Sequence, residues 1–430
     1  MKASRRSFFR QMSAAAGALS LSGMAAKAAS FEVADGLKSL QSLDPFAAAE
    51  DELSWAAVRQ AYTVSPSIIN LNNGGVSPQP KVVQEANDRY YHLSNEAPSY
   101  YMWGILDQGR EPLREKLANL ACCSPEEIAI NRNATEALDT VIYGMDLKKG
   151  DEVILTRQDY PNMINAWKQR EMRDGIKLVW LNLDMPTENA DYVVKAFTDA
   201  VTPKTKVFHI THMINWNGQI MPVKRLCEEA KKRNIFSLVD GAHTFAHMDF
   251  KVPDFGCDAY GTSLHKWLCA PFGTGMHYLR KERITEIWPI FTNDNPRGDN
   301  IRKFESLGTR SFAPEQAIGQ AIDFHNAIGP KRKEERLRYL KNYWCEKVKD
   351  HPKVKLNISL KPDFSCALGN FAVEGKEPGE IATRLFNDYK IHVVGIVWEN
   401  IKGVRVTPHV YTLTSELDKL AAAIHKIADS

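Results

Sequence analysis

The sequence predicts an α/β protein in which a large domain built on a mostly parallel sheet is followed by a smaller α+β domain. Between residue 127 and about residue 242, short apolar runs rich in β-branched residues alternate with helical patterns. That alternation is typical of a parallel sheet covered by helices on both faces. After about residue 300 the pattern changes to long amphipathic helices over 315–350, then to mixed elements over 354–430. We therefore expect domains at 69–300 and 301–430.

The individual elements follow from their local patterns. Residues 47–62 form a helical pattern that ends before Ser65 and Pro66, and we assign 29–68 to a segment that contributes to the small domain. Residues 69–80 indicate a short strand that runs into a glycine-containing loop. Further along the chain, we expect strands at 127–132, 151–156, 177–183, 206–211 and 235–242, and helices at 134–145 and 223–234.

The charge of the chain argues against nucleic acid as a partner. The formal net charge is +3, from 55 basic and 52 acidic residues. Without the five basic residues of positions 1–28, which contain no acid, 50 basic residues face 52 acidic ones, a net charge of −2. A nearly neutral chain has no general field that attracts a polyanion or an anionic membrane. Local mixed runs such as KRKEER at 331–336 are interpreted as solvated helix faces.

The N-terminus has the layout of an export signal. A basic stretch with paired arginines, Arg5 and Arg6, precedes a mildly apolar stretch over 11–23 and the small residues around Ala28. The paired arginines resemble the twin-arginine export signal, and the apolar stretch is too short to span a bilayer stably. We expect residues 1–28 to engage the twin-arginine translocation machinery and to be removed, which leaves a soluble periplasmic protein without a membrane anchor. A frayed basic terminus is the alternative.

Seven cysteines are too few for a disulfide scaffold, and none form a CxxC pair with zinc-ligand spacing. Their odd number suits a protein that folds in the reducing cytoplasm before it is exported.

Polar residues follow three of the predicted strands, at the edge where parallel sheets bind ligands. The NRNATEA stretch at 131–137 offers a helix N-terminus and the Thr135 hydroxyl to an anion, although Asn133 or Thr135 at this position is also typical of a helix cap. Asp240 ends an apolar strand, and a buried carboxylate there needs a partner, with an aspartate in an ordinary turn as the alternative. Lys266 lies among apolar residues, which lower the pKa of an amine and make it available as a nucleophile or base; an ordinary surface lysine is the alternative for this segment alone.

Together, in this order, these features resemble the fold-type I, class V family of pyridoxal-phosphate enzymes, which includes cysteine desulfurases and isopenicillin N epimerase-like proteins. The resemblance covers roughly residues 65–425. It is carried by Asp240 in VDGAH and by the lysine of S-x-H-K about 26 residues later. It implies a seven-stranded sheet and pyridoxal 5'-phosphate as the cofactor.

The resemblance also implies roles for individual residues. Lys266 would form a Schiff base with the cofactor, Asp240 would pair with the ring nitrogen, and His243 would contact the ring's 3-oxygen. Tyr160 would stack on the ring, and Asn215 would lie near its oxygen. The phosphate would be held by Ala134, Thr135, Ser263 and His265.

Three more positions concern the substrate and the partner subunit. Arg405 matches an arginine that binds a substrate carboxylate, for which a planar guanidinium is well suited. Asn73 and the aromatic run over 100–103 are expected on the substrate side, with core packing as the alternative for the aromatics. Thr309 resembles a residue that reaches the neighbouring subunit's phosphate, which implies a homodimer.

The expected activity is that of an aminotransferase-like enzyme acting on an amino acid or a peptide-like metabolite. The alternatives are an epimerase, a lyase or decarboxylating enzyme, and a non-catalytic protein that binds pyridoxal phosphate. A metal site at His243, His247 and Asp249 is a separate alternative. Residues 385–404 contain no cysteine, and Cys366 is expected to pack as a small apolar residue; this argues against cysteine desulfuration.

Overall fold

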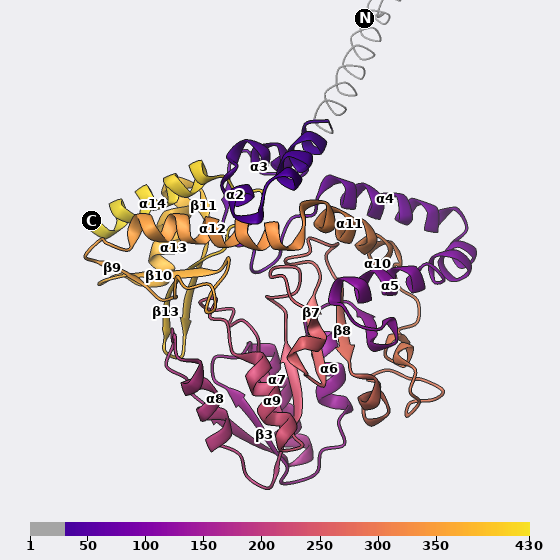
Figure 1. Ribbon diagram of the computed structural model, residues 1–430. Helices are drawn as coiled ribbons and strands as arrows, with labels where there is room; N and C mark the ends of the chain where they lie inside the picture. The colour runs from indigo at the N-terminus through magenta and orange to yellow at the C-terminus, as the bar shows by residue number, and fades with distance from the viewer. Residues whose placement is uncertain (1–30) are drawn as a thin grey trace, which may run out of the picture.

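The computed structural model describes residues 31–430, so the predicted export signal lies outside the described residues. A seven-stranded sheet forms the centre of the large domain (Figure 1), with the strand order β2-β8-β7-β6-β5-β3-β4. Only β8 runs antiparallel to its neighbours, and the expected mostly parallel sheet is confirmed. The strands are β2 (Ile128–Asn131), β3 (Glu152–Thr156), β4 (Lys177–Leu181), β5 (Thr205–Thr211), β6 (Phe236–Asp240), β7 (Ala259–Ser263) and β8 (Gly275–Leu279).

Helices cover both faces of this sheet. Alternate residues of a strand point to opposite faces, so the apolar side chains of one strand pack against helices on both sides. On β6, Leu238 packs into the core cluster that contains residues of α6 and α7, and Val239 packs into the cluster that contains residues of α5 and α9. The α-helices of this part are α4 (Lys81–Glu96), α5 (Arg110–Ala121), α6 (Ala134–Gly144), α7 (Pro161–Asp174), α8 (Ala190–Asp199) and α9 (Val223–Lys232). Shorter helices are a π-helix, Tyr100–Leu106, and 3-10 helices at Pro125–Glu127, Val252–Phe255, Lys281–Glu286 and Ile301–Glu305.

The C-terminal part is an antiparallel four-stranded sheet with helices packed on it. Its strand order is β12-β13-β10-β9, and Trp344 and Phe371 are buried in its core. The strands are β9 (Val354–Leu356), β10 (Gly369–Val373), β12 (Val394–Trp398) and β13 (Ile401–Val406). The helices packed on this sheet are α12 (Pro330–Val348), α13 (Pro378–Tyr389) and α14 (Thr414–Asp429), whereas α10 (Ala313–Gln316) and α11 (Ile318–Ile328) pack against α4 and α5 of the large domain.

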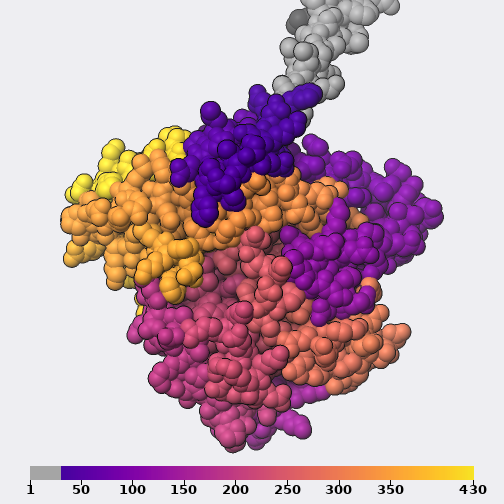
Figure 2. All heavy atoms as spheres, in the orientation of Figure 1, coloured from indigo at the N-terminus to yellow at the C-terminus, as the bar shows by residue number. Residues whose placement is uncertain are grey.

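The N-terminal segment lies across α12, where Figure 2 shows it in indigo over orange residues. The single helix expected over 47–62 is wrong. Two helices, α2 (Pro45–Glu50) and α3 (Glu52–Arg59), meet at Asp51, whose carboxylate accepts a hydrogen bond from the Ser54 N–H and so begins α3 as a cap. Trp55 is fully buried in this contact with the C-terminal part.

The next segment is also joined to the C-terminal part. The short strand β1 (Ile69–Asn70) pairs in parallel with β11 (Ile391–His392). The loop that follows β1 is thereby held beside the small sheet and at the edge of the large one. Within residues 31–430, no helix has both the length and the apolar character that a membrane crossing requires.

Candidate active site

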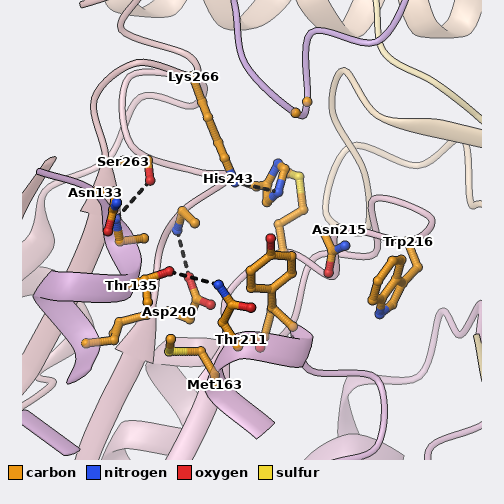
Figure 3. Close-up of a pocket in the computed structure, with 18 of the residues that line it drawn as sticks. Asn133, Thr135, Met163, Thr211, Asn215, Trp216, Asp240, His243, Ser263 and Lys266 are labelled. Carbon is orange, nitrogen blue, oxygen red and sulfur yellow. Dashed lines mark hydrogen bonds between the residues drawn. The ribbon is translucent and has the colours of Figure 1, made fainter. Parts of the chain in front are cut away.

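A cavity of about 440 Å³ lies at the carboxyl ends of the central parallel strands (Figure 3), within the size range of small-molecule sites. Thr211, Asp240 and Ser263 line it from the last positions of β5, β6 and β7. The cavity therefore lies where the topology of an α/β sheet predicts a ligand. The small domain closes the opposite side with Val394, Ile396 and Arg405.

Lys266 points into this cavity from the turn that follows β7, and its Nζ lies 3.1 Å from Nε2 of His243. The pKa of the amine is lowered to about 8, chiefly by burial; the Asp240 charge opposes this shift and the Arg405 charge contributes to it. An appreciable share of the amine is therefore neutral and nucleophilic near neutral pH.

The turn behind Lys266 is held rigidly by aromatic stacking. The Trp267 ring is fully buried and stacks on His247 at 3.8 Å and on His409 at 5.5 Å between ring centroids. Lys333 of α12, itself buried, donates a hydrogen bond to the Trp267 carbonyl and lies 3.4 Å from Nδ1 of His325. The small domain thus binds the peptide unit next to the lysine.

The position of Lys333 corrects one sequence interpretation. The run 331–336 was expected to be a solvated helix face, but Lys333, Glu334, Glu335 and Arg336 are all less than a tenth exposed. Lys333, Glu334 and Arg336 contact other chain segments: for example, Arg336 donates to the carbonyl oxygens of Ala49 and Thr412. Glu335 instead pairs with Lys331 and Arg338 of the same helix. A mixed-charge helix whose charges are satisfied by other segments is buried, and sequence alone does not reveal those partners.

Asp240 lies 5 % exposed at the end of β6, and its Oδ1 accepts a hydrogen bond from the Ala242 N–H at 2.9 Å. Burial raises the pKa of this carboxyl, whereas that hydrogen bond and the charges of His209 and Lys266 oppose the shift. The close packing here requires glycine at position 241, because a Cβ would lie 1.8 Å from Cζ of Tyr260. Asp240 is a buried carboxylate placed to pair with a cationic group in the cavity.

His243 presents a neutral imidazole. Burial drives its pKa well below the ordinary value, and the charges of Lys266 and Arg405 add to the effect. Its buried Nδ1 has no hydrogen-bond partner among the described residues, and neither has the buried Oδ1 of Asn215. Two unsatisfied polar atoms in residues that line one cavity indicate a polar ligand between them.

The start of α6 forms an anion cradle. The Ala134 N–H donates to Oγ of Ser263 at 2.9 Å, and Oγ1 of Thr135 accepts a hydrogen bond from Asn162 at 3.3 Å. Asn133 caps the helix by accepting from the Glu136 N–H, so the cap and the cradle use different residues. The positive end of the helix dipole points at the same place. His265 also lines the cavity, and its Nδ1 lies 3.0 Å from the Thr274 carbonyl oxygen.

Arg405 lies on the opposite wall, 7 % exposed. Its Nη1 donates to the Asn215 carbonyl at 2.9 Å, and its Nη2 donates to Oδ1 of Asn72 at 2.9 Å. Burial lowers the pKa of the guanidinium to about 10. These contacts orient the side chain, and it remains a cation at neutral pH. Tyr160 also borders the cavity, with its ring centroid 6.0 Å from the Nζ of Lys266.

Other predicted residues lie elsewhere. Asn73 does not line the cavity: it is fully buried, donates to the Thr407 carbonyl oxygen and accepts from the Tyr411 hydroxyl. Thr309 borders a different surface hollow, and so does Trp103 of the aromatic run. Contact of Thr309 with a neighbouring active site would require a partner subunit at this hollow.

The metal alternative is wrong. Both ring nitrogens of His247 are engaged, one with the His243 carbonyl oxygen and one with the Ala367 N–H, and Asp249 lies exposed outside the cluster. Among residues 31–430, no group of three metal-ligating side chains comes together.

Sequence reasoning missed part of the site. Four residues were not predicted: Asn72, Trp216, Val394 and Ile396. The apolar run VVGIVW at 393–398 and the position of Trp216 beside Asn215 are the signals that could have found three of them.

The aminotransferase class-V family model matches residues 69–395. This chain belongs to the aminotransferase class-V family. It is similar to isopenicillin N epimerases from Streptomyces clavuligerus (29 % identical, covering 86 % of this chain and 97 % of that protein) and Amycolatopsis lactamdurans (28 %, covering 87 % and 99 %). A probable cysteine desulfurase from Halalkalibacterium halodurans is 28 % identical and covers 84 % of this chain and 93 % of that protein.

Solved structures share the fold. A variant of C-DES with glycine covalently linked to its pyridoxal-phosphate cofactor superposes with a TM-score of 0.77 at 21 % identity, covering 86 % of this chain and 99 % of that one. The apo cysteine desulfurase of Thermococcus onnurineus NA1 has the same TM-score at 23 % identity, covering 86 % and 97 %. These neighbours confirm the predicted fold-type I architecture.

Pyridoxal 5'-phosphate is the cofactor of this family member, and the cavity fits it. Lys266 would supply the amine, and Asp240 would supply the carboxylate that a protonated ring nitrogen requires. The unsatisfied Nδ1 of His243 and Oδ1 of Asn215 provide polar contacts. The cradle at the start of α6, with Ser263, would hold the phosphate.

The expectation that the protein is unlikely to be a cysteine desulfurase is not supported, because several relatives are named as probable cysteine desulfurases. Among the described residues, the cavity lining contains no cysteine. Cys366 is buried outside it, and burial raises the pKa of its thiol to about 12. A desulfurase reaction at this site would need a sulfur acceptor other than these side chains.

Proposed function

We propose that this protein removes the α-proton of an amino-acid substrate in an aminotransferase-like reaction. The observation that supports it is the position of the Lys266 amine, whose pKa is about 8, in one cavity with Asp240 and the guanidinium of Arg405. An amine of that pKa accepts and returns a proton efficiently near neutral pH.

Each residue has a definite part in the proposal. Arg405 binds the substrate carboxylate through the N–H groups of its guanidinium that Asn72 and Asn215 leave free, and Lys266 moves the proton at Cα. Pyridoxal phosphate supplies the electron sink for the pair of electrons that the proton leaves behind. Asp240 stabilises the proton on the ring nitrogen, and neutral His243 donates or accepts a hydrogen bond without competing for that proton.

Epimerisation is the second candidate, because two isopenicillin N epimerases match this chain over most of its length. Transamination needs one proton-moving group, whereas epimerisation by two groups needs a base that accepts the proton at one face of Cα and a donor that returns one at the other face. The hydroxyl of Tyr160 is the candidate for that donor, since its ring borders the same cavity at 6.0 Å from the Lys266 amine.

Replacing Tyr160 with phenylalanine separates the two reactions. We expect the variant to keep formation of the oxo acid from an amino acid within about tenfold, since the ring remains and one hydrogen bond is lost. Exchange of the α-proton with solvent deuterium and oxo-acid formation are measured together by NMR. Oxo acid with exchange supports transamination. If the parent protein inverts Cα without forming oxo acid, and the variant loses that inversion, the reaction is epimerisation and the transamination proposal is wrong.

We further propose that the protein reaches the periplasm through the twin-arginine route. The double variant Arg5→Lys, Arg6→Lys should stay in the cytoplasm with its N-terminus uncleaved. The control variant Arg10→Lys should be exported and cleaved. Fractionation and N-terminal mass spectrometry are the measurements. Normal export of the double variant would contradict the proposal.

We also propose that the protein forms a homodimer. Its support is the exposure of Tyr100, Trp103 and Ile105 close to the hollow that contains Thr309, because large apolar groups gathered on a surface are typical of interfaces.

A further inference from the structure

The two sides of the cavity differ in chemistry. Lys266, Asp240, His243 and the phosphate cradle make the wall of the large sheet polar. On the small sheet, Val394 lies directly across from Arg405 in the pairing of β12 with β13. Because cross-strand partners lie on one face with their Cβ atoms about 5 Å apart, Arg405 has an apolar neighbour where a bound carboxylate would sit.

The apolar surface continues away from Arg405. Alternate residues of a strand share a face, so Ile396 and Trp398 follow Val394 on the same side of β12. Val394 and Ile396 both line the cavity, and Ile396 is 5 % exposed. The Trp398 ring stacks on Trp216 at 4.8 Å between centroids, and Trp216 also lines the cavity. We call Val394, Ile396, Trp216 and Trp398 the apolar stripe.

The stripe is held in place by the large domain. Nε1 of Trp398 donates to the Arg157 carbonyl at 2.8 Å, and Asn400 donates to the Leu183 carbonyl at 2.8 Å. The stripe is therefore fixed next to Arg405. Among the described residues that line the cavity, Asp240 is the acidic one, and it lies on the cofactor side.

We propose that the substrate is an amino acid with a branched aliphatic or aromatic side chain that lies along the apolar stripe. The inference rests on the proposed function, since it takes Arg405 as the site of the α-carboxylate. A charged side chain on this surface would lose its water without gaining a partner, whereas an apolar one gains burial.

The test uses the holoenzyme with L-leucine, L-phenylalanine, L-alanine, L-aspartate and L-lysine. Binding is followed by the absorption change of the bound cofactor, and exchange of the α-proton is followed by NMR in deuterated water. We expect leucine and phenylalanine to exceed alanine, aspartate and lysine by at least about tenfold in kcat/KM and in affinity, because one methylene in an apolar pocket changes kcat/KM by about 10- to 200-fold.

Two matched variants test the stripe itself. Ile396→Thr keeps a β-branched residue on the strand but makes the cavity face polar, and should reduce the leucine-to-alanine ratio about tenfold. Val397→Thr makes the same change one residue along, on the outward face where the side chain is 68 % exposed, and should leave the ratio unchanged. Val394→Thr serves as the second cavity variant if Ile396→Thr folds poorly.

The outcomes are distinct. Aspartate or lysine equal to or better than leucine would overturn the substrate assignment and leave the proposed function standing. An unchanged leucine-to-alanine ratio in both Ile396→Thr and Val394→Thr would also overturn the substrate assignment and leave the proposed function standing. Failure of every amino acid to perturb the cofactor absorption or to exchange would overturn the proposed function, and the assignment with it.

Discussion

Replacing Lys266 with alanine should abolish covalent attachment of pyridoxal phosphate and reduce kcat by roughly 10²- to 10⁴-fold. The amine is both the group that forms the covalent bond and the group placed to move the proton, so its loss removes two functions at once. Borohydride reduction followed by mass spectrometry should find the cofactor on Lys266 in the parent protein and on no lysine in the variant.

The matched control is Lys341→Met. Lys341 is fully buried, and burial lowers the pKa of its amine also to about 8, but that amine contacts Ser365 in the small domain. The control should lose stability and keep the adduct. An adduct that persists on another lysine in Lys266→Ala would refute the assignment.

The rate of cofactor attachment should also depend on pH in a defined direction. Only the neutral amine attacks the aldehyde, and its pKa is lowered from the usual range to about 8. Attachment to the apoprotein should therefore speed up by about tenfold per pH unit below pH 8 and level off above it. A rise that continued to pH 10 would indicate an unperturbed lysine.

Asp240→Asn should leave the cofactor attached but lower kcat by roughly 10²- to 10³-fold. An amide removes the negative charge that stabilises the proton on the ring nitrogen, and with it the capacity of the ring to accept electrons. The absorption of the bound cofactor should shift because that nitrogen loses its proton, and KM should change less than kcat.

Asp258→Asn is the control for this change. Asp258 is equally buried and accepts hydrogen bonds from Ser237, but it lies just before β7, at the opposite end of the strands from the cavity. It should lower the melting temperature without altering the spectrum. If the two variants lose the same activity and show the same spectrum, Asp240 has only a structural role.

The strand ends explain why much of the site was predictable. A buried apolar strand followed by Asp240, and another followed by Ser263 and Lys266, must bring these groups to one edge when the strands are parallel. The order of motifs along the chain therefore carries spatial information, and the structure brings these residues and Arg405 to one cavity.

The residues that sequence reasoning misplaced depend on contacts between distant segments. In the run INLNNGG nothing distinguishes Asn72, which contacts Arg405, from Asn73, whose side chain is taken up by Thr407 and Tyr411. The side that each amide faces is set by the contact of this loop with the small domain. Likewise, Val394 belongs to the site because of its register with Arg405, and register is a property of two strands.

Lys266 and Arg405 belong to separate layers of the molecule. One follows a strand of the large sheet, and the other lies on a strand whose Val404 and Val406 pack in the separate core of the small domain. A substrate that contacts both Lys266 and Arg405 therefore connects the large domain to the small domain for as long as it is bound. By mass action, a substrate bound by both domains stabilises the arrangement in which Lys266 and Arg405 face one cavity, and release of the product removes that stabilisation. A bound substrate should therefore hold the two domains together more strongly than the empty site does.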